Sequence, residues 1–119
     1  MPDDGLLVDV VGGVPVVAAP EEIDITNADA LRSAVLQAAE SGPGTLVVDM
    51  TRTRFCDSSG PHALLAAHKR AEAEGGEVLL VIPSALVLRV FALTGVDRMI
   101  PNFPSLADAL ARPASAALI

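Results

Sequence analysis

The stretch from Thr45 to Arg70 reads TLVVDMTRTRFCDSSGPHALLAAHKR, and its pattern decides how the chain folds. Leu46 to Val48 are apolar and β-branched enough to predict a buried strand. The polar residues Asp49 to Arg54 predict a turn, and the alanine and leucine residues from Pro61 onward predict a helix. The tetrapeptide Asp57 to Gly60 lies between the turn and the helix. The stretch therefore predicts a strand, a turn and a helix, with two serines where the helix begins.

The start of this helix presents the hydroxyl groups of Ser58 and Ser59. The first backbone N–H groups of a helix have no partner within the helix, and they carry the positive end of its dipole. Pro61 supports a helix start here, because proline lacks an N–H group and is tolerated in a first turn, where no donor is needed. A phosphate on one of these hydroxyls would therefore be favourably placed.

The composition limits the class of protein. The chain has 119 residues, of which 51% are hydrophobic, so one domain over 1–119 with a substantial core is expected. Its apolar runs are too short for a membrane span, and the acidic start, Met1 to Asp4, differs from a basic secretory leader. Cys56 is the single cysteine, which excludes an internal disulfide and suits a reducing cytoplasm.

The charge of the chain bears on its partners. The net charge is −7, there is no basic run, and tryptophan and tyrosine are absent from the sequence. Nucleic acids and acidic membranes attract cationic surfaces, and nucleic acids also favour aromatic residues that stack on bases. The expected partner is another protein.

Strand-like and helix-like segments alternate along the chain. Gly12 and Gly13 predict a tight hairpin turn, because glycine takes positive φ at both central positions. Thr26, Ser84 and Ser105 predict helix caps. The expected elements are strands 6–11 and 14–19, a helix from Thr26 that ends at 42–44, a strand 46–48, a helix 59–74, a strand 78–82, a helix 85–94, an edge strand 98–100 and a last helix after Ser105. This order predicts an α/β fold with a mixed central sheet of about five strands and four helices packed against it.

The helix expected over Ala85 to Thr94 is apolar on nearly all sides, and Arg89 is its only charged residue. Such a helix is either packed deeply in the core or presents part of its surface to a partner. Packing in the core is the favoured interpretation.

The chain resembles the STAS domains of the anti-sigma factor antagonist family, also called anti-anti-sigma factors, over a core of about 6–111, with 113–119 as a C-terminal tail. The residues that carry the resemblance are Glu22-Ile23-Asp24, Val47-Val48-Asp49, Phe55-Cys56-Asp57-Ser58-Ser59-Gly60, Gly75-Gly76 and Leu93-Thr94-Gly95-Val96-Asp97. Asp-Ser-Ser-Gly alone is a weak signal, but its place after a buried strand, with the other pieces in register, makes it specific.

The resemblance implies the STAS fold, with the four helices packed mainly on one side of the sheet, and it implies a partner-switching protein. In that family the first serine of the motif, here Ser58, is phosphorylated by a cognate anti-sigma factor that is itself a serine kinase. Ser59 is interpreted as either the actual helix cap or a substitute acceptor. The unphosphorylated protein binds the kinase and releases its sigma factor, the phosphorylated protein does not, and a phosphatase restores binding. No cofactor and no metal are implied. The implied partner-binding residues are Asp24, Asp57, Ser58, Ser59, Gly60 and His62.

Three of these residues also have a purely structural interpretation. Ser58 can be a helix N-cap or a turn serine. Asp57 can be a turn or cap carboxylate, or it can orient the Ser58 hydroxyl, and Asp24 can close the loop before the first helix. Arg52 and Arg54 add positive charge to the preceding turn, and one of them could pair with a phosphate or with Asp57.

The cysteine and the two histidines have simpler expected roles. Cys56 is expected to be a small buried hydrophobic residue. His62 and His68 are six residues apart, which does not suit zinc ligation on one helix face, so both are expected at the surface or its boundary.

Three other classes of function compete with the switch. A hydrolase is disfavoured, because the chain has no Gly-x-Ser-x-Gly elbow and no histidine after His68 to act as a base. Nucleotide binding is disfavoured because the glycines form neither Gly-x-Gly-x-x-Gly nor a P-loop. The third class is a STAS scaffold without phosphorylation, as a subunit of a lipid-transport or stress-signalling assembly. A weak homodimer is left open.

Overall fold

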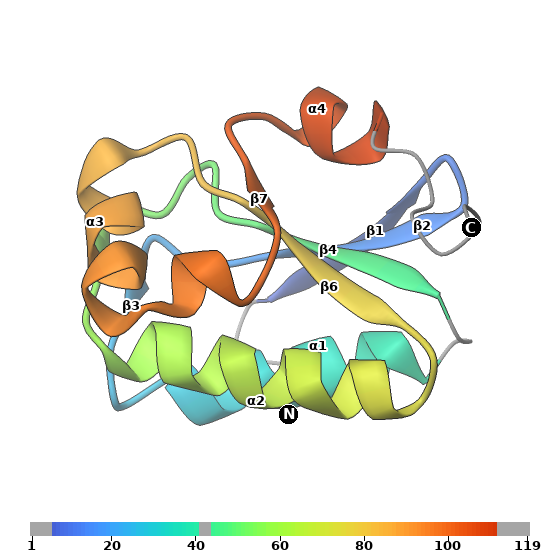
Figure 1. Ribbon diagram of the computed structural model, residues 1–119, viewed down its shortest axis with the longest axis horizontal. Helices are drawn as coiled ribbons and strands as arrows, with labels where there is room; N and C mark the ends of the chain where they lie inside the picture. The colour runs from blue at the N-terminus through green and yellow to red at the C-terminus, as the bar shows by residue number, and fades with distance from the viewer. Residues whose placement is uncertain (1–5, 41–43, 112–119) are drawn as a thin grey trace.

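A five-stranded sheet lies at the centre of the computed structural model, which describes residues 6–40 and 44–111 (Figure 1). In sheet order the strands are β1 (Leu7–Val11), β2 (Val14–Ala18), β4 (Thr45–Asp49), β6 (Glu77–Val81) and β7 (Asn102–Phe103). β1 and β2 are antiparallel, whereas the other neighbouring pairs are parallel. The mixed sheet predicted from the sequence is therefore confirmed.

Gly12 and Gly13 connect β1 to β2 with φ angles of 59° and 83°. Both values lie in the left-handed region, which glycine enters without a steric penalty. The two glycines let Val11 pair directly with Val14, as the hairpin prediction required.

Three helices cover one face of the sheet, and a short fourth helix covers the other (Figure 1). The first face carries α1 (Ala28–Ala39), α2 (Ser59–Ala73) and α3 (Ala85–Thr94), and the second carries α4 (Leu106–Ala111). Successive strand residues point to opposite faces. Val48 therefore belongs to the large core under α1, α2 and α3, whereas Val47 belongs to the smaller core with Ala109. Four helices mainly on one side were expected, and this is confirmed.

Three sequence expectations fall outside the described residues: the acidic start 1–4, the helix stop at 42–43 and the tail 113–119. Every helix within the described ranges is too short or too polar to cross a bilayer.

A second, two-stranded parallel sheet pairs β3 (Glu22–Ile23) with β5 (Phe55–Cys56). The Glu21 carbonyl accepts hydrogen bonds from the N–H groups of Arg54 at 2.7 Å and Phe55 at 3.2 Å. This small sheet was not predicted, because two-residue strands carry no recognisable hydrophobic period. It joins the loop before α1 to the loop before α2.

The prediction that Thr26 caps the first helix is wrong. The N-cap is Asn27, whose side chain makes no cap hydrogen bond, and the helix begins at Ala28. The Thr26 hydroxyl instead donates to Asp24 Oδ1 at 2.5 Å. The aspartate therefore forms a closed loop with the threonine before the helix begins.

The prediction of an edge strand over Arg98 to Ile100 is also wrong. Val96–Arg98 forms a 3₁₀ turn, and the edge strand β7 follows Pro101 instead of ending at it. The Pro101 carbonyl accepts from the Leu80 N–H group at 2.9 Å. Proline is compatible with this place because it precedes an edge strand, where its missing N–H group breaks no ladder bond.

His68 is buried, so its expected place at the surface or boundary is wrong. Only 3% of the residue is exposed, and its Nδ1 atom accepts a hydrogen bond from the Val78 N–H group at 3.1 Å. Its Nε2 atom lies 3.2 Å from Glu72 Oε2. The histidine therefore connects α2 to the start of β6, which explains a polar side chain on the apolar face of the helix.

The predicted bounds of α3 are confirmed, including the Ser84 cap, whose hydroxyl accepts from the Val87 N–H group at 3.3 Å. The expectation that this helix is core is correct for only one face. Val87 and Phe91 are buried, whereas Leu86 and Leu93 are 74% and 76% exposed.

Candidate functional site

The small sheet brings the two acidic residues of the predicted site to the same place. Ile23 pairs with Cys56, and Asp24 and Asp57 directly follow the two strands in the chain. The Asp57 N–H group donates to the Ile23 carbonyl at 3.0 Å, which fixes one loop against the other. Because the strands are parallel, both carboxylates leave the sheet at the same end, next to the start of α2.

Asp57 holds the second serine of the motif. Its Oδ1 atom accepts from the Ser59 N–H group at 2.9 Å and from the Ser59 hydroxyl at 2.5 Å. A carboxylate that accepts from an early N–H group of a helix satisfies an unpaired donor and opposes the positive end of the dipole. Asp57 therefore acts as a cap carboxylate and orients Ser59 rather than Ser58.

Ser58 is exposed at the N-cap position of α2, with φ −67° and ψ −15°. Its hydroxyl caps no backbone N–H group, and within the described part of the chain it makes no hydrogen bond. Its carbonyl accepts from the His62 N–H group at 3.3 Å, which continues the helix. Of the two serines, Ser58 thus has the accessible and unengaged hydroxyl.

Asp24 closes the loop before α1, as one of its two interpretations proposed. Its Oδ1 atom accepts from both the N–H group and the hydroxyl of Thr26. The Thr26 hydroxyl bond, aided by the backbone N–H bond, lowers the pKa of Asp24 below the ordinary 3.8. The group therefore carries a full negative charge on this surface at neutral pH.

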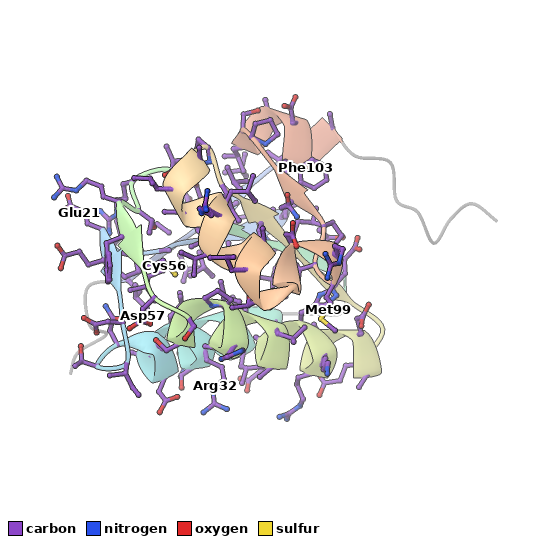
Figure 2. All side chains as sticks on the ribbon, turned by 60° about the vertical axis from the view of Figure 1, so that its left-hand side comes forward. Glu21, Arg32, Cys56, Asp57, Met99 and Phe103 are labelled. Carbon is purple, nitrogen blue, oxygen red and sulfur yellow. The ribbon has the colours of Figure 1, made fainter. Side chains whose placement is uncertain are left out.

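His62 is exposed one turn into α2 and lines a groove between α1 and α2. The groove has a volume of about 400 Å³, and its other lining residues include Ile25, Ser59 and Arg32. Arg32 lies 3.6 Å from Asp29 in an exposed ion pair. Figure 2 shows Arg32 on α1 near the Asp57 end of α2. The groove beside the two serines therefore combines the polar His62, the cationic Arg32 and the apolar Ile25.

Gly60 and Cys56 lie beneath this surface. Gly60 is buried, and a Cβ atom on it would lie 2.4 Å from Cys56 Sγ. The glycine thus allows α2 to begin directly against the small sheet. Cys56 is 4% exposed, which confirms its expected role as a small buried residue. Burial, with a smaller contribution from the Asp57 charge, raises the pKa of the thiol to about 12, so it stays protonated at neutral pH.

The two arginines of the preceding turn make no ion pair with Asp57 among the described residues. Arg52 Nε donates to the Ala19 carbonyl at 3.1 Å, which fixes the turn to the end of β2. Arg54 is exposed beside Phe55 and lines a separate groove near α3.

A family model, the STAS domain, matches residues 6–109. The chain belongs to the STAS domain family. Its resemblance to that family, carried by the Asp-Ser-Ser-Gly motif and the pieces around it, is therefore confirmed.

Anti-sigma factor antagonists are among the relatives of this STAS domain. RsfB of Mycobacterium tuberculosis, an anti-sigma-F factor antagonist, is 31% identical over 98 residues, which cover 82% of this chain and 80% of RsfB. The crystal structure of an anti-sigma factor antagonist from Mycobacterium paratuberculosis is 35% identical, with a TM-score of 0.75 over 92% of this chain and 94% of that one. The antagonist SpoIIAA shares the fold at 23% identity. The TM-score is 0.73 for its unphosphorylated form, over 97% of this chain and 99% of that one, and 0.64 for the phosphorylated form from Bacillus, over 89% and 96%.

In this STAS domain the small sheet and the start of α2 gather most of the residues that the sequence had singled out. Gly60 lies underneath and contributes by its small size. Two neighbouring residues were missed, Ile25 and Arg32. Ile25 is 80% exposed, and an apolar residue inside a polar loop is a signal that could have identified it. Arg32 carried no comparable signal, since helix surfaces commonly carry arginine.

Proposed function

We propose that this STAS domain is a cytoplasmic anti-sigma factor antagonist and that phosphorylation of Ser58 controls its binding to an anti-sigma factor that is also a serine kinase. The interface comprises five residues that we call the switch surface: Asp24, Asp57, Ser58, Ser59 and His62. The observation that carries the proposal is the exposed Ser58 hydroxyl at the start of α2, which has no hydrogen-bond partner among residues 6–40 and 44–111, beside a Ser59 hydroxyl already held by Asp57. The names of the relatives support the same class of function.

The modification is an ordinary phosphoryl transfer. A P–O bond forms between the Ser58 oxygen and the γ-phosphorus of ATP, the bond to the β-phosphate oxygen breaks, and ADP leaves. The hydroxyl proton passes to a base of the kinase. The antagonist contributes the acceptor and its position, so it is not itself the enzyme. SpoIIAA, which shares the fold, exists in unphosphorylated and phosphorylated forms.

The phosphate would change the surface more than the fold. It adds roughly −1.5 to −2 charge at neutral pH next to Asp24 and Asp57. The positive end of α2 accommodates that charge, so the core under Gly60 is not disturbed. A partner shaped for a neutral hydroxyl meets repulsion, and coupling of about 1–3 kcal/mol is typical of such switches. Removal of the phosphate by a serine phosphatase returns the binding form.

Two variants at one position test the proposal. Ser58→Ala and Ser58→Asp are used as baits in extract from the source cells, and the captured anti-sigma factor is then purified for calorimetry. Ser58→Ala is expected to bind it and to escape control, whereas Ser58→Asp is expected to bind at least tenfold more weakly. Incubation with the purified kinase and ATP, followed by mass spectrometry, is expected to place phosphate on Ser58.

A matched control is Ser59→Ala, which should still be phosphorylated at Ser58. Equal affinity of the two Ser58 variants would contradict the switch. A stable complex in which Ser58 is never modified would favour the alternative of a STAS scaffold.

A further inference from the structure

The main sheet has one long free edge, and that edge is β1. β1 and β7 are the outermost strands, and β7 has only two residues whereas β1 has five. Within residues 6–40 and 44–111, β2 is the only strand that pairs with β1. An edge strand presents backbone N–H and C=O groups that can pair with another chain. β1 is therefore the strand of this sheet that is most open to pairing with a second molecule.

The side chains of β1 favour such pairing. Leu7, Val8 and Val10 are 62%, 52% and 62% exposed. Successive residues of a strand point to opposite faces, so the exposure of the neighbours Leu7 and Val8 means that neither layer of helices fully covers this strand. An apolar edge strand that is exposed on both faces is of the kind that associates with other chains.

The backbone groups on the free side of the strand belong to Val8 and Val10. Val11 and Val14 flank the tight turn and pair with each other, and a turn of this kind joins its flanking residues by a hydrogen bond. Hydrogen-bonded and non-hydrogen-bonded pairs alternate along an antiparallel ladder. Counted back from Val11, Asp9 also directs its backbone groups to β2. Val8 and Val10 therefore direct their N–H and C=O groups away from β2.

Asp9 occupies one of these outward donors. Its Oδ1 atom accepts a hydrogen bond from the Val10 N–H group at 2.8 Å, at an exposed position. Asp9 is also the only charged residue of β1. Its carboxylate therefore lies where the carbonyl group of an added strand would have to bind.

The charge of Asp9 also opposes pairing between two copies of β1. An antiparallel pair of identical strands is related by a two-fold axis. The register that pairs all five residues places Leu7 of one copy opposite Val11 of the other, and hence Asp9 opposite Asp9. The two aspartates would form a non-hydrogen-bonded pair, in which the Cα atoms are about 4.5 Å apart. Like charges directly opposite one another destabilise a pair of strands, and any shifted register leaves residues of β1 unpaired.

We propose that Asp9 closes the edge of β1 to a second copy of this chain. It does so by holding the Val10 N–H group and by placing two carboxylates opposite each other in the register that would pair the whole strand. This inference is independent of the proposed function, because β1 carries no residue of the switch surface. It also bears on the homodimer that the sequence left open: with Asp9 in place, β1 does not form one.

The test compares Asp9→Thr with wild type by sedimentation velocity over a wide range of protein concentration. Threonine is uncharged and favours strands, so this variant should keep the fold and free the edge. We expect wild type to be monomeric and Asp9→Thr to form a reversible dimer, with an association constant at least tenfold higher. Asp9→Lys should stay monomeric, because two lysines then stand opposite each other. Asp108→Thr is the matched control, because it removes the same charge from an exposed position on α4 and should also stay monomeric.

Amide hydrogen exchange measured by NMR locates the contact. In Asp9→Thr, the N–H groups of Val8 and Val10 should exchange more slowly as the concentration rises, because they become donors to the other copy. Adding Val10→Pro to Asp9→Thr removes an outward donor without breaking a bond to β2, so it should restore the monomer.

Three results would overturn the proposal. The first is an Asp9→Thr variant that is as monomeric as wild type, or a wild type that already dimerises through the N–H groups of Val8 and Val10. The second is dimerisation of Asp9→Lys or Asp108→Thr as strong as that of Asp9→Thr. The third is an Asp9→Thr dimer in which exchange at Val8 and Val10 does not change with concentration, because the two copies would then meet elsewhere.

Discussion

Replacing Gly60 with alanine should destabilise the domain, and the structure gives the size of the effect. The added Cβ atom would lie 2.4 Å from Cys56 Sγ and 3.1 Å from Ile23 Cγ2. Non-bonded heavy atoms pack at about 3.5–4.0 Å, so the contact with sulfur is short by more than about 1 Å. Overpacking costs about 1–3 kcal/mol, and alanine recovers at most about 1 kcal/mol over glycine in a helix. The expected loss in the free energy of unfolding is about 1–2 kcal/mol.

A double-mutant cycle identifies the thiol as the cause. Cys56→Ala alone removes a buried atom and should cost about 1 kcal/mol. In the Cys56→Ala protein, Gly60→Ala no longer meets the sulfur, so the second substitution should cost less than about 0.5 kcal/mol. The coupling between the two positions is therefore expected to be about 1–2 kcal/mol.

The assay is urea unfolding of the four proteins, followed by far-UV circular dichroism and analysed by linear extrapolation. Ser58→Ala serves as a control, because an exposed substitution two residues away should change stability by less than about 0.5 kcal/mol. If the effects of Gly60→Ala and Cys56→Ala simply add within about 0.5 kcal/mol, the close contact is not what requires glycine here.

Three further outcomes are expected. His68→Phe keeps a ring in place but leaves a buried N–H group without an acceptor, which should cost about 1–3 kcal/mol in urea unfolding, whereas exposed His62→Phe should change stability by less than about 0.5 kcal/mol. Because the folded state raises the pKa of Cys56 from 9.0 to about 12, the stability from the protonated thiol is complete below pH 9 and is lost as the pH rises toward 12; equal decline in wild type and Cys56→Ala over this range would contradict this. Asp57→Ala releases the Ser59 hydroxyl, so phosphopeptide mapping after kinase treatment should find phosphate on Ser59 as well as on the first serine; unchanged site selection would show that Asp57 does not decide the acceptor.

The parts of the fold with local causes were predictable from sequence. Gly12 and Gly13 specify their turn through backbone freedom alone, and Ser84 caps its helix through a neighbouring N–H group. The pairing of Ile23 with Cys56 has no local cause, because the two short segments are far apart in the chain and meet only in the tertiary fold. The strand prediction at Pro101 was wrong for a related reason. Whether a proline ends or precedes a strand depends on which neighbouring strand donates a hydrogen bond to its carbonyl.

The candidate site was predictable in place but not in detail. The spacing of Asp57, Ser58 and Ser59 after a buried strand located it. Which serine the carboxylate holds depends on the backbone angles at Ser58, and no local sequence pattern specifies those angles. The exposure of Leu86 could not be predicted from a helix that is apolar on nearly all sides.

The small parallel sheet has a consequence for how the domain is recognised. A synthetic peptide covering 45–70 contains every atom of the Asp-Ser-Ser-Gly tetrapeptide, but it lacks the strand Glu22–Ile23 that anchors the tetrapeptide from outside. Under the proposed function, the modifying enzyme reads a shape assembled from two distant segments rather than a linear consensus. The enzyme would then not phosphorylate nascent or unfolded chains. The phosphorylated fraction of the protein would therefore contain only molecules that have completed folding.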